Sequence, residues 1–254
     1  MFGIDRQVYY RSLRRRKQRR TVAGQVVDLV ATQRQTQPRI GTRKLYFLLY
    51  GQLQKLKVGR DRFFDILRAN HLLVKPKRSY QVTTFSHHRF RKHPNLVTGL
   101  QINRPELVWV SDITYIGKRE KPCYLSLITD AYSKKIVGYN VSNSLSSQGS
   151  IKALKMAHKN RSGKTGHIIH HSDRGIQYCC DEYQYLLSKY GLRCSMTQNS
   201  DPYENAVAER VNGILKQEFM IDNYHRELRS YYLFFSCSRR TKYSAMNLFC
   251  NNSF

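Results

Sequence analysis

The sequence predicts two parts: an all-α, strongly basic N-terminal region and an α/β core with a mixed five-stranded sheet. Apolar residues recur at helical spacing in the N-terminal region, whereas after Pro105 apolar β-rich runs alternate with amphipathic stretches. Charge divides the chain similarly, because residues 1–100 hold 23 Lys and Arg against 4 Asp and Glu, and residues 101–254 hold 21 against 13. The expected divisions are a basic helical region at 1–74, a basic linker at 75–103, the core at 104–221 and a distinct tail at 222–254.

Helical periodicity predicts three helices in the basic region. In the second, Leu45 and Leu49 recur four residues apart after Thr42, which is placed to act as the N-cap. In the third, Phe63 and Leu67 belong to one apolar stripe. The three helices are expected at about 22–33, 42–53 and 58–73, with Gly51 as an alternative end of the second, before Leu53 is reached. The arginine cluster at 11–20 is interpreted as a solvated charged helix or tail.

Two short amphipathic helices joined tightly, with arginines on the second, describe a helix-turn-helix. In that arrangement Arg60, Arg62 and Arg68 would meet phosphates or guanine edges of DNA. A small helical bundle with an ordinary basic surface is the alternative, and the charge asymmetry of the chain favours DNA contact. We expect the linker at 75–103 to lie along a nucleic-acid backbone, with its histidines solvated.

The bulk composition indicates a nucleic-acid partner. The net charge is +27, a property that concerns partners and not the fold. No apolar run approaches the roughly 20 residues that span a bilayer, and the N-terminus has no apolar core of the signal-peptide type. None of the six cysteines belongs to a C-x-x-C pair, so we expect reduced thiols and no zinc knuckle.

In the core, three apolar, β-rich runs are joined by short turns and are expected to form antiparallel strands. Two further short strands each follow a helix, which predicts crossover connections. Gly191 ends one helix, and Asp201 with Pro202 begins the last. The expected strands are 106–116, 123–132, 134–142, 166–173 and 192–197, and the expected helices are 146–160, 176–191 and 201–219.

Three carboxylates stand out against this pattern. Asp112 lies inside the first apolar strand, where both propensity and burial disfavour an aspartate. Asp173 comes just past the fourth strand, and strand ends are where α/β folds bind ligands. Glu209 lies about 200° round its helix from Val207, off the buried stripe. Converging carboxylates bind hard cations such as Mg²⁺, and two ions about 4 Å apart serve phosphodiester chemistry.

The spacing of these acids leaves alternatives open. Sixty residues separate Asp112 from Asp173 and 35 separate Asp173 from Glu209, and a turn aspartate with two surface acids would fit equally well. A zinc site at His170 and His171 is disfavoured, because no other soft ligand is placed to join them. The turn interpretation explains Asp173 alone and leaves the buried strand aspartate without a reason.

The segments WVSDITYI, HSDRGIQY and DPYENAVAERVNGILKQEF together resemble the integrase core of bacterial insertion-sequence transposases, in the family whose catalytic part is encoded by a second reading frame. The N-terminal QPRIGTRKLYFLL and GRDRFFDILRANHLLVKPKR are similar to the helix-turn-helix that precedes that core. The resemblance covers about residues 1–220. It implies membership of the retroviral-integrase superfamily and a ribonuclease-H-like fold.

The resemblance implies that Asp112, Asp173 and Glu209 form a catalytic acidic triad that holds two Mg²⁺ or Mn²⁺ ions. It also implies DNA cleavage by water at the ends of an insertion element, then strand transfer by a 3′-hydroxyl without a covalent intermediate. The residues implied to lie near the DNA are Asn205, Arg210 and Lys216. The implied partners are element ends, target DNA, further copies in a homo-oligomer and an upstream-frame product, in the bacterial cytoplasm at the nucleoid.

The sequence departs from the family after Ile221. The family continues through Arg-Pro-His and a later Thr-Pro, and neither occurs in residues 222–254, so we interpret this tail as aberrant, from a frameshifted or truncated copy. An active transposase is the expected function. The alternative is a catalytically impaired DNA-binding derivative that competes for element ends. A ribonuclease would share the fold and metal, and the helix-turn-helix argues against it.

Overall fold

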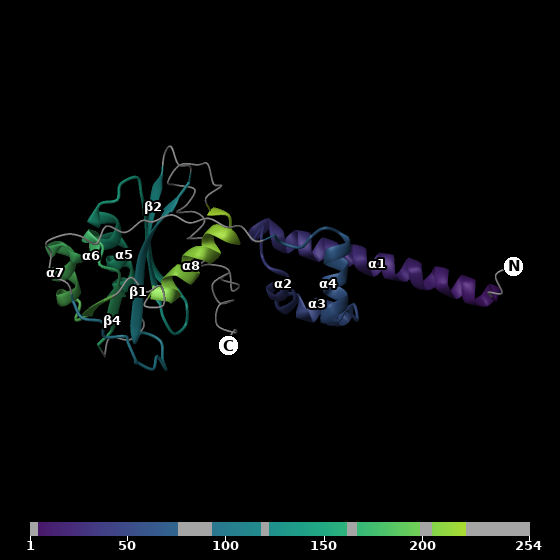
Figure 1. Cartoon of the computed structure of the whole chain (residues 1–254), viewed down its shortest axis with the longest axis horizontal. Coiled ribbons are helices and arrows are strands. Elements are labelled where there is room, and N and C mark those ends of the chain that lie inside the picture. Colours follow the sequence, from purple (N-terminus) through teal and green to yellow (C-terminus); the bar gives the residue numbers. More distant parts are fainter. Residues whose placement is uncertain (1–4, 76–92, 118–121, 162–166, 199–204, 222–254) are drawn as a thin grey trace. The chain divides into compact units, whose positions relative to one another are not determined.

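The computed structural model describes residues 5–75, 93–117, 122–161, 167–198 and 205–221. The chain divides into two compact units (Figure 1). Unit 1 comprises Met1–Arg78 and Gln217–Met220, and unit 2 comprises Ser79–Lys216 and Ile221–Phe254. The expected tail and the expected cap at position 201 lie outside the described residues. Of the helices that are described, none is both long and apolar enough to cross a membrane.

Unit 1 is helical. Its elements are α1 (Arg6–Thr36), α2 (Thr42–Leu48), α3 (Tyr50–Lys55) and α4 (Arg60–Ala69). The C-terminal half of α1 packs with the three short helices around a core that includes Val26, Leu45, Leu53, Phe63 and Leu67. Each of these side chains is buried, and full burial of such a side chain contributes about 1.5–3 kcal/mol. The apolar periodicity of the region thus becomes one small hydrophobic core.

The helices of unit 1 differ from the expected ones at three points. α1 is longer than 22–33 and includes the arginine cluster, because Arg, Lys and Gln are good helix formers and Asp5 caps the helix. The Asp5 side chain accepts a hydrogen bond from the backbone N–H of Gln7 at 3.0 Å. The expected helix at 42–53 is interrupted at Leu49, which separates α2 from α3. Gly41, and not Thr42, occupies the N-cap position of α2.

Unit 2 contains a mixed five-stranded sheet, which confirms the prediction from the sequence. The sheet order is β3-β2-β1-β4-β5. The first three strands pair antiparallel, whereas β4 joins β1 and β5 joins β4 in parallel, as the helix crossovers require. The strands are β1 (Val108–Ile116), β2 (Cys123–Asp130), β3 (Ile136–Ser142), β4 (Ile169–Ser172) and β5 (Arg193–Met196).

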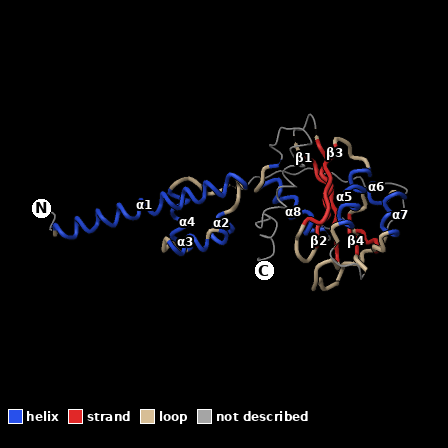
Figure 2. The backbone as a smooth tube through the Cα atoms, turned by 180° about the vertical axis from the view of Figure 1, so that it is seen from behind, coloured by secondary structure: helices blue, strands red, loops and turns tan. Residues whose placement is uncertain are grey.

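Helices cover both faces of this sheet. The helices of unit 2 are α5 (Ser147–Lys159), α6 (Ile176–Cys179), α7 (Asp181–Lys189) and α8 (Ala206–Gln217). The first three lie on one side of the strands and α8 on the other, as Figures 1 and 2 show. β3 and α5 approach closely at Gly138, where an added Cβ would lie 2.2 Å from the carbonyl oxygen of Ala153. A side chain cannot fit there.

Two segments of unit 2 differ from the expectations. The helix expected at 176–191 is broken at Cys180, whose ψ of 149° is extended. The acidic pair Asp181 and Glu182 then begins α7, where acidic residues favour a helix start. Residues 93–103, expected as linker, pack in part on the core: the backbone N–H of Leu96 donates to the Oγ of Ser195 at 2.8 Å. Leu96 is also partly buried against the sheet.

Candidate active site

The two faces of β1 carry different chemistry. Val108 and Val110 lie on the side of the sheet that α8 covers and pack with apolar residues there. Trp109 points to the opposite side, into the core shared with α5 and α7. Because side chains alternate along a strand, Asp112 lies on the α8 side with the two valines. The aspartate inside the apolar strand therefore faces a helix and not the centre of the larger core.

Asp112 is partly buried and accepts two hydrogen bonds. Its Oδ1 accepts from the backbone N–H of Ile113 at 2.9 Å, and its Oδ2 accepts from the Nδ2 of Asn212 at 2.5 Å. Desolvation raises the pKa of the Asp112 carboxyl to about 7, and the charges of Asp173 and, more weakly, Glu209 act in the same direction. The two hydrogen bonds lower this pKa but are outweighed. In the absence of a cation, Asp112 is therefore readily protonated near neutral pH.

Asp173 directly follows β4. In the parallel pairing of β1 with β4, Val110 lies opposite His171, so continuing this register by two residues brings Asp173 beside Asp112. The Asp173 Oδ1 accepts a hydrogen bond from the backbone N–H of Gly175 at 3.0 Å. This Asx turn fixes the loop that leaves the strand. Asp173 is thus both a turn residue and the neighbour of a second carboxylate.

Glu209 is exposed in the first turn of α8, and its charge contributes to the raised pKa of Asp112. Among the residues that the structure describes, no three His, Cys, Asp or Glu side chains lie close enough together to hold a metal ion. The structure thus brings Asp112 and Asp173 together and leaves Glu209 within electrostatic reach, without a closed ligand set. Carboxylates that repel one another in this way suit a hard divalent cation, whose charge would relieve the repulsion.

A buried polar network lies on the α7 side of β1. The Nε2 of His170 lies 2.7 Å from the Oγ of Ser111 and 2.9 Å from the hydroxyl of Tyr183. Burial lowers the pKa of His170 to about 3, with His171 acting in the same direction, so the ring is neutral. The Nδ1 of His171 lies 2.9 Å from the Oγ of Ser195. Both rings are fully buried, which fits a structural role and not a zinc or DNA contact.

The arginines expected to contact DNA through the helix-turn-helix lie on α4 in unit 1. All three, Arg60, Arg62 and Arg68, are exposed. The Nε of Arg60 lies 3.2 Å from the Oδ1 of Asp61, and the Nη1 of Arg68 lies 2.6 Å from the Oδ1 of Asp65. Exposed ion pairs of this kind contribute about 0–1 kcal/mol, so these arginines can exchange a carboxylate for a phosphate at little cost.

The other residues expected near DNA lie at or just before α8. Arg210 is exposed, Lys216 is partly buried and Asn205 is buried. Asn212, which donates to Asp112, is not among the site residues expected from the sequence. The available signal is its distance from Glu209 in the sequence. Asn212 follows Glu209 by three residues, about one helical turn, so the two side chains are neighbours on the surface of α8.

Comparison with known proteins identifies related sequences. Residues 102–202 match the integrase core domain family. The insertion element IS600 uncharacterized 31 kDa protein of Shigella sonnei is 33% identical over 221 residues, which cover 86% of this chain and 80% of that protein. The transposase for insertion sequence element IS904 of Lactococcus lactis is 33% identical over 138 residues, 54% of each chain. The chain thus covers about half of this second relative.

Transposase InsF for insertion sequence IS3fB of Escherichia coli is 32% identical over 153 residues, which cover 60% of this chain and 53% of that protein. Among solved structures, the HTLV-2 integrase catalytic core domain in complex with magnesium is similar with a TM-score of 0.41. It is 17% identical in sequence, and the match covers 54% of this chain and 88% of that one.

Proposed function

The chain belongs to the bacterial insertion-sequence transposases of the integrase superfamily, and from this membership we propose that it cleaves and joins DNA at the ends of an insertion element. Its core has the ribonuclease-H-like integrase fold. One observation carries the proposal: the parallel pairing of β1 with β4 puts Asp112 beside Asp173, with Glu209 in electrostatic reach. Together these three residues are the proposed catalytic triad.

We assign two Mg²⁺ ions, replaceable by Mn²⁺, to Asp112, Asp173 and Glu209. Oxygen ligands suit these cations, and Mg²⁺ keeps several waters, so few protein groups are needed. Burial raises the pKa of Asp112 most and the charge of Asp173 raises it further, and this second effect supports the assignment because a cation would relieve the repulsion between the carboxylates. When bound, such ions would activate the attacking oxygen and stabilise the leaving oxygen of a phosphodiester.

The residues of the chain would position these parts. Asn212 donates to Oδ2 of Asp112 and the backbone of Ile113 donates to Oδ1, so the carboxylate has a fixed orientation. Arg210, exposed next to Glu209, is suited to a phosphate of the bound strand. The further residues that we propose to contact DNA are Asn205 and Lys216 in unit 2 and Arg60, Arg62 and Arg68 in unit 1.

An insertion element has two ends, which must be held together during joining. We therefore propose that the active form is a homo-oligomer on DNA and that the product of an upstream reading frame joins it. Light scattering on the purified chain, with and without end DNA, measures the number of copies. A single copy on a duplex that carries both ends would contradict the oligomer.

The proposal is tested with the full chain, Mg²⁺ and a labelled duplex that carries the genomic DNA flanking its reading frame. The expected products are a nicked strand with a free 3′-hydroxyl and joined strands, both read by sequencing gels. Asp173→Asn and Glu209→Gln should abolish both products and keep DNA binding. Asp181→Asn, which removes an exposed carboxylate of α7, should keep cleavage and serves as the matched control.

Two outcomes would overturn the proposal. Tight DNA binding with no cleavage in either Mg²⁺ or Mn²⁺ would identify a DNA-binding derivative in place of an enzyme. Cleavage of an RNA–DNA hybrid without cleavage of the duplex would identify a ribonuclease. Full activity of Asp173→Asn or Glu209→Gln would remove the triad, whatever the products.

A further inference from the structure

Among the described residues of unit 1, none packs against the N-terminal half of α1. Val26 and Val30 in its C-terminal half are buried in the core, whereas every residue from 5 to 21 is exposed. Figure 1 shows this half of α1 continuing past α4 toward the N-terminus. A helix without tertiary packing relies on intrinsic propensity, which contributes little over this length. Packing in the hydrophobic core therefore does not explain the composition of this half of α1.

The charged side chains of this half are all positive. Between Arg6 and Val27 there are eight Arg and Lys residues and no Asp or Glu. In the part of the chain that the structure describes, Arg11, Arg15 and Arg19 form no ion pair with a carboxylate. Like charges four residues apart on a helix destabilise it. This arrangement is unfavourable in isolation and becomes favourable with a polyanion beside it.

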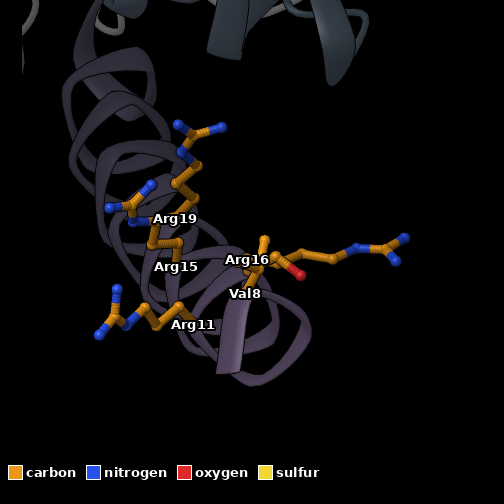
Figure 3. Close-up of a pocket in the computed structure, with 6 residues that line it drawn as sticks. Val8, Arg11, Arg15, Arg16 and Arg19 are labelled. Atoms are coloured by element: carbon orange, nitrogen blue, oxygen red, sulfur yellow. The ribbon is translucent and has the colours of Figure 1, made fainter. Parts of the chain in front are cut away.

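Three of these arginines share one face. Arg11, Arg15 and Arg19 follow one another at four-residue spacing and line one surface pocket. Figure 3 shows the three side chains leaving the same side of α1, while Arg16 points elsewhere. Their Cα atoms therefore stand about 6 Å apart along the helix axis. We call this row, Arg11, Arg15 and Arg19, the arginine ladder.

The arginine ladder continues the face of α1 that packs on the rest of unit 1. Arg15 and Val26 are eleven residues apart, as are Arg19 and Val30. Eleven residues are close to three turns of about 3.6 residues, so each pair points in nearly the same direction. The ladder therefore lies on the side of α1 toward which α4 packs. The ladder therefore continues, along the axis of α1, the side of this helix that packs within unit 1.

We propose that the arginine ladder binds the sugar–phosphate backbone of DNA as a contact that does not read sequence; the choice of DNA rests on the proposed function. The planar guanidinium group pairs with phosphate oxygens through two parallel N–H donors, and duplex DNA presents phosphates continuously. A membrane surface fits less well, because the face opposite the ladder is not continuously apolar. The exposed Tyr10 and Leu13 lie there together with Lys17 and Arg20.

The other faces of the same segment supply a matched control. The ladder variant is R11Q/R15Q/R19Q, and the control variant is R14Q/K17Q/R20Q, which removes the same number of charges from exposed residues outside the ladder. Both are made in the full chain and compared by far-UV circular dichroism for equal helix content. Binding to a duplex of arbitrary sequence is measured by fluorescence anisotropy over a range of salt concentrations, without a divalent cation.

The expected result is a smaller salt dependence for the ladder variant only. Each phosphate contact contributes about 0.9 to the slope of log K against log salt, so losing three contacts lowers the slope by roughly 2.7. The control variant should change the slope by less than about 1. The loss of affinity should be the same for duplexes of different sequence, because phosphate contacts carry no sequence information.

Other outcomes would overturn the proposal. Equal slope changes in the two variants would mean general attraction by net charge and no defined ladder. An unchanged slope in the ladder variant, with lost binding to phosphatidylserine vesicles, would assign the face to a membrane surface. The assay contains no metal and needs no cleavage, so an inactive enzyme would leave its result intact, and failure of the proposed function is seen separately.

Discussion

Replacing Asp112 with asparagine should stabilise the metal-free protein at pH 8 while abolishing cleavage. Desolvation and the charge of Asp173 raise the pKa of Asp112 from 3.8 to about 7. The folded state therefore holds this proton more tightly than the unfolded chain does. Stability falls as the pH rises above about 4 and reaches its low value above pH 7. Asparagine keeps the shape of the side chain and carries no charge, so it escapes this loss. Its amide N–H can donate to the Oδ1 of Asn212 once the Asn212 amide turns over.

The magnitude follows from the two pKa values. The interval from 3.8 to about 7 corresponds to roughly 4 kcal/mol, at about 1.4 kcal/mol per pH unit. Asp112 is partly exposed, so solvent screening reduces the effect, and we expect about 1–2 kcal/mol. A change of that size raises the thermal midpoint by roughly 2–8 °C. At pH 5 the gain should fall to less than half, because only the first part of the titration has then occurred.

Thermal unfolding followed by circular dichroism in EDTA, at about pH 5 and pH 8, measures this difference. The control is Asp181→Asn, an exposed carboxylate at the start of α7, which should leave the midpoint unchanged or slightly lower. Added Mg²⁺ should raise the wild-type midpoint at pH 8 and have little effect on Asp112→Asn. The reasoning is refuted if Asp112→Asn is no more stable than wild type at pH 8, or gains equally at both pH values.

Three further changes test other parts of the structure. Asn212→Ala removes the amide that donates to Asp112, the proposed catalytic carboxylate of β1, so cleavage in the duplex assay should fall roughly 10- to 100-fold with unchanged DNA affinity; a change below twofold would contradict this. Gly138→Ala places a methyl group 2.2 Å from the carbonyl oxygen of Ala153 and should cost about 1–3 kcal/mol or more in urea unfolding. Gly213→Ala, whose methyl meets nothing within 4 Å, is its control and should be neutral or stabilising. Phe63→Ala leaves a cavity in the core of unit 1 and should lower the free energy of unfolding by about 3–5 kcal/mol. DNA binding should be lost, while tryptophan fluorescence should show that unit 2 is still folded. An unchanged unfolding profile would contradict the placement of Phe63 in this core.

The sheet of unit 2 was predictable because two separate features of the sequence indicate its strands. Apolar, β-rich runs give their positions, and the lengths of the connections give their directions. Asp112 was recognisable for the same reason: a carboxylate inside such a run breaks the pattern. Its partner followed from topology, because a strand end reached by a crossover is where ligands bind. The parallel register of β1 with β4 then supplied the side-by-side placement.

The parts that sequence reasoning missed depend on signals other than apolar periodicity. The first half of α1 buries nothing, so no stripe marks it, and only the helix propensity of its basic residues predicts it. The break at Cys180 lies inside a continuous amphipathic pattern, so the apolar periodicity does not mark it. The network of Ser111, His170 and Tyr183 joins positions 59 and 13 residues apart, and no spacing rule connects them. Such contacts become visible only after the sheet order is known.

The position of β4 beside β1 also determines when, during synthesis, the two proposed catalytic aspartates can come together. β1 is complete long before its parallel neighbour is translated, because the antiparallel strands and α5 lie between them in the chain. A nascent or prematurely terminated chain that ends before β4 therefore contains α1 to α4 and the three antiparallel strands, but no paired aspartates. Pairing distant strands is slow compared with forming helices. Any fragment that stops before Asp173 thus lacks one of the two aspartates on which the proposed cleavage depends.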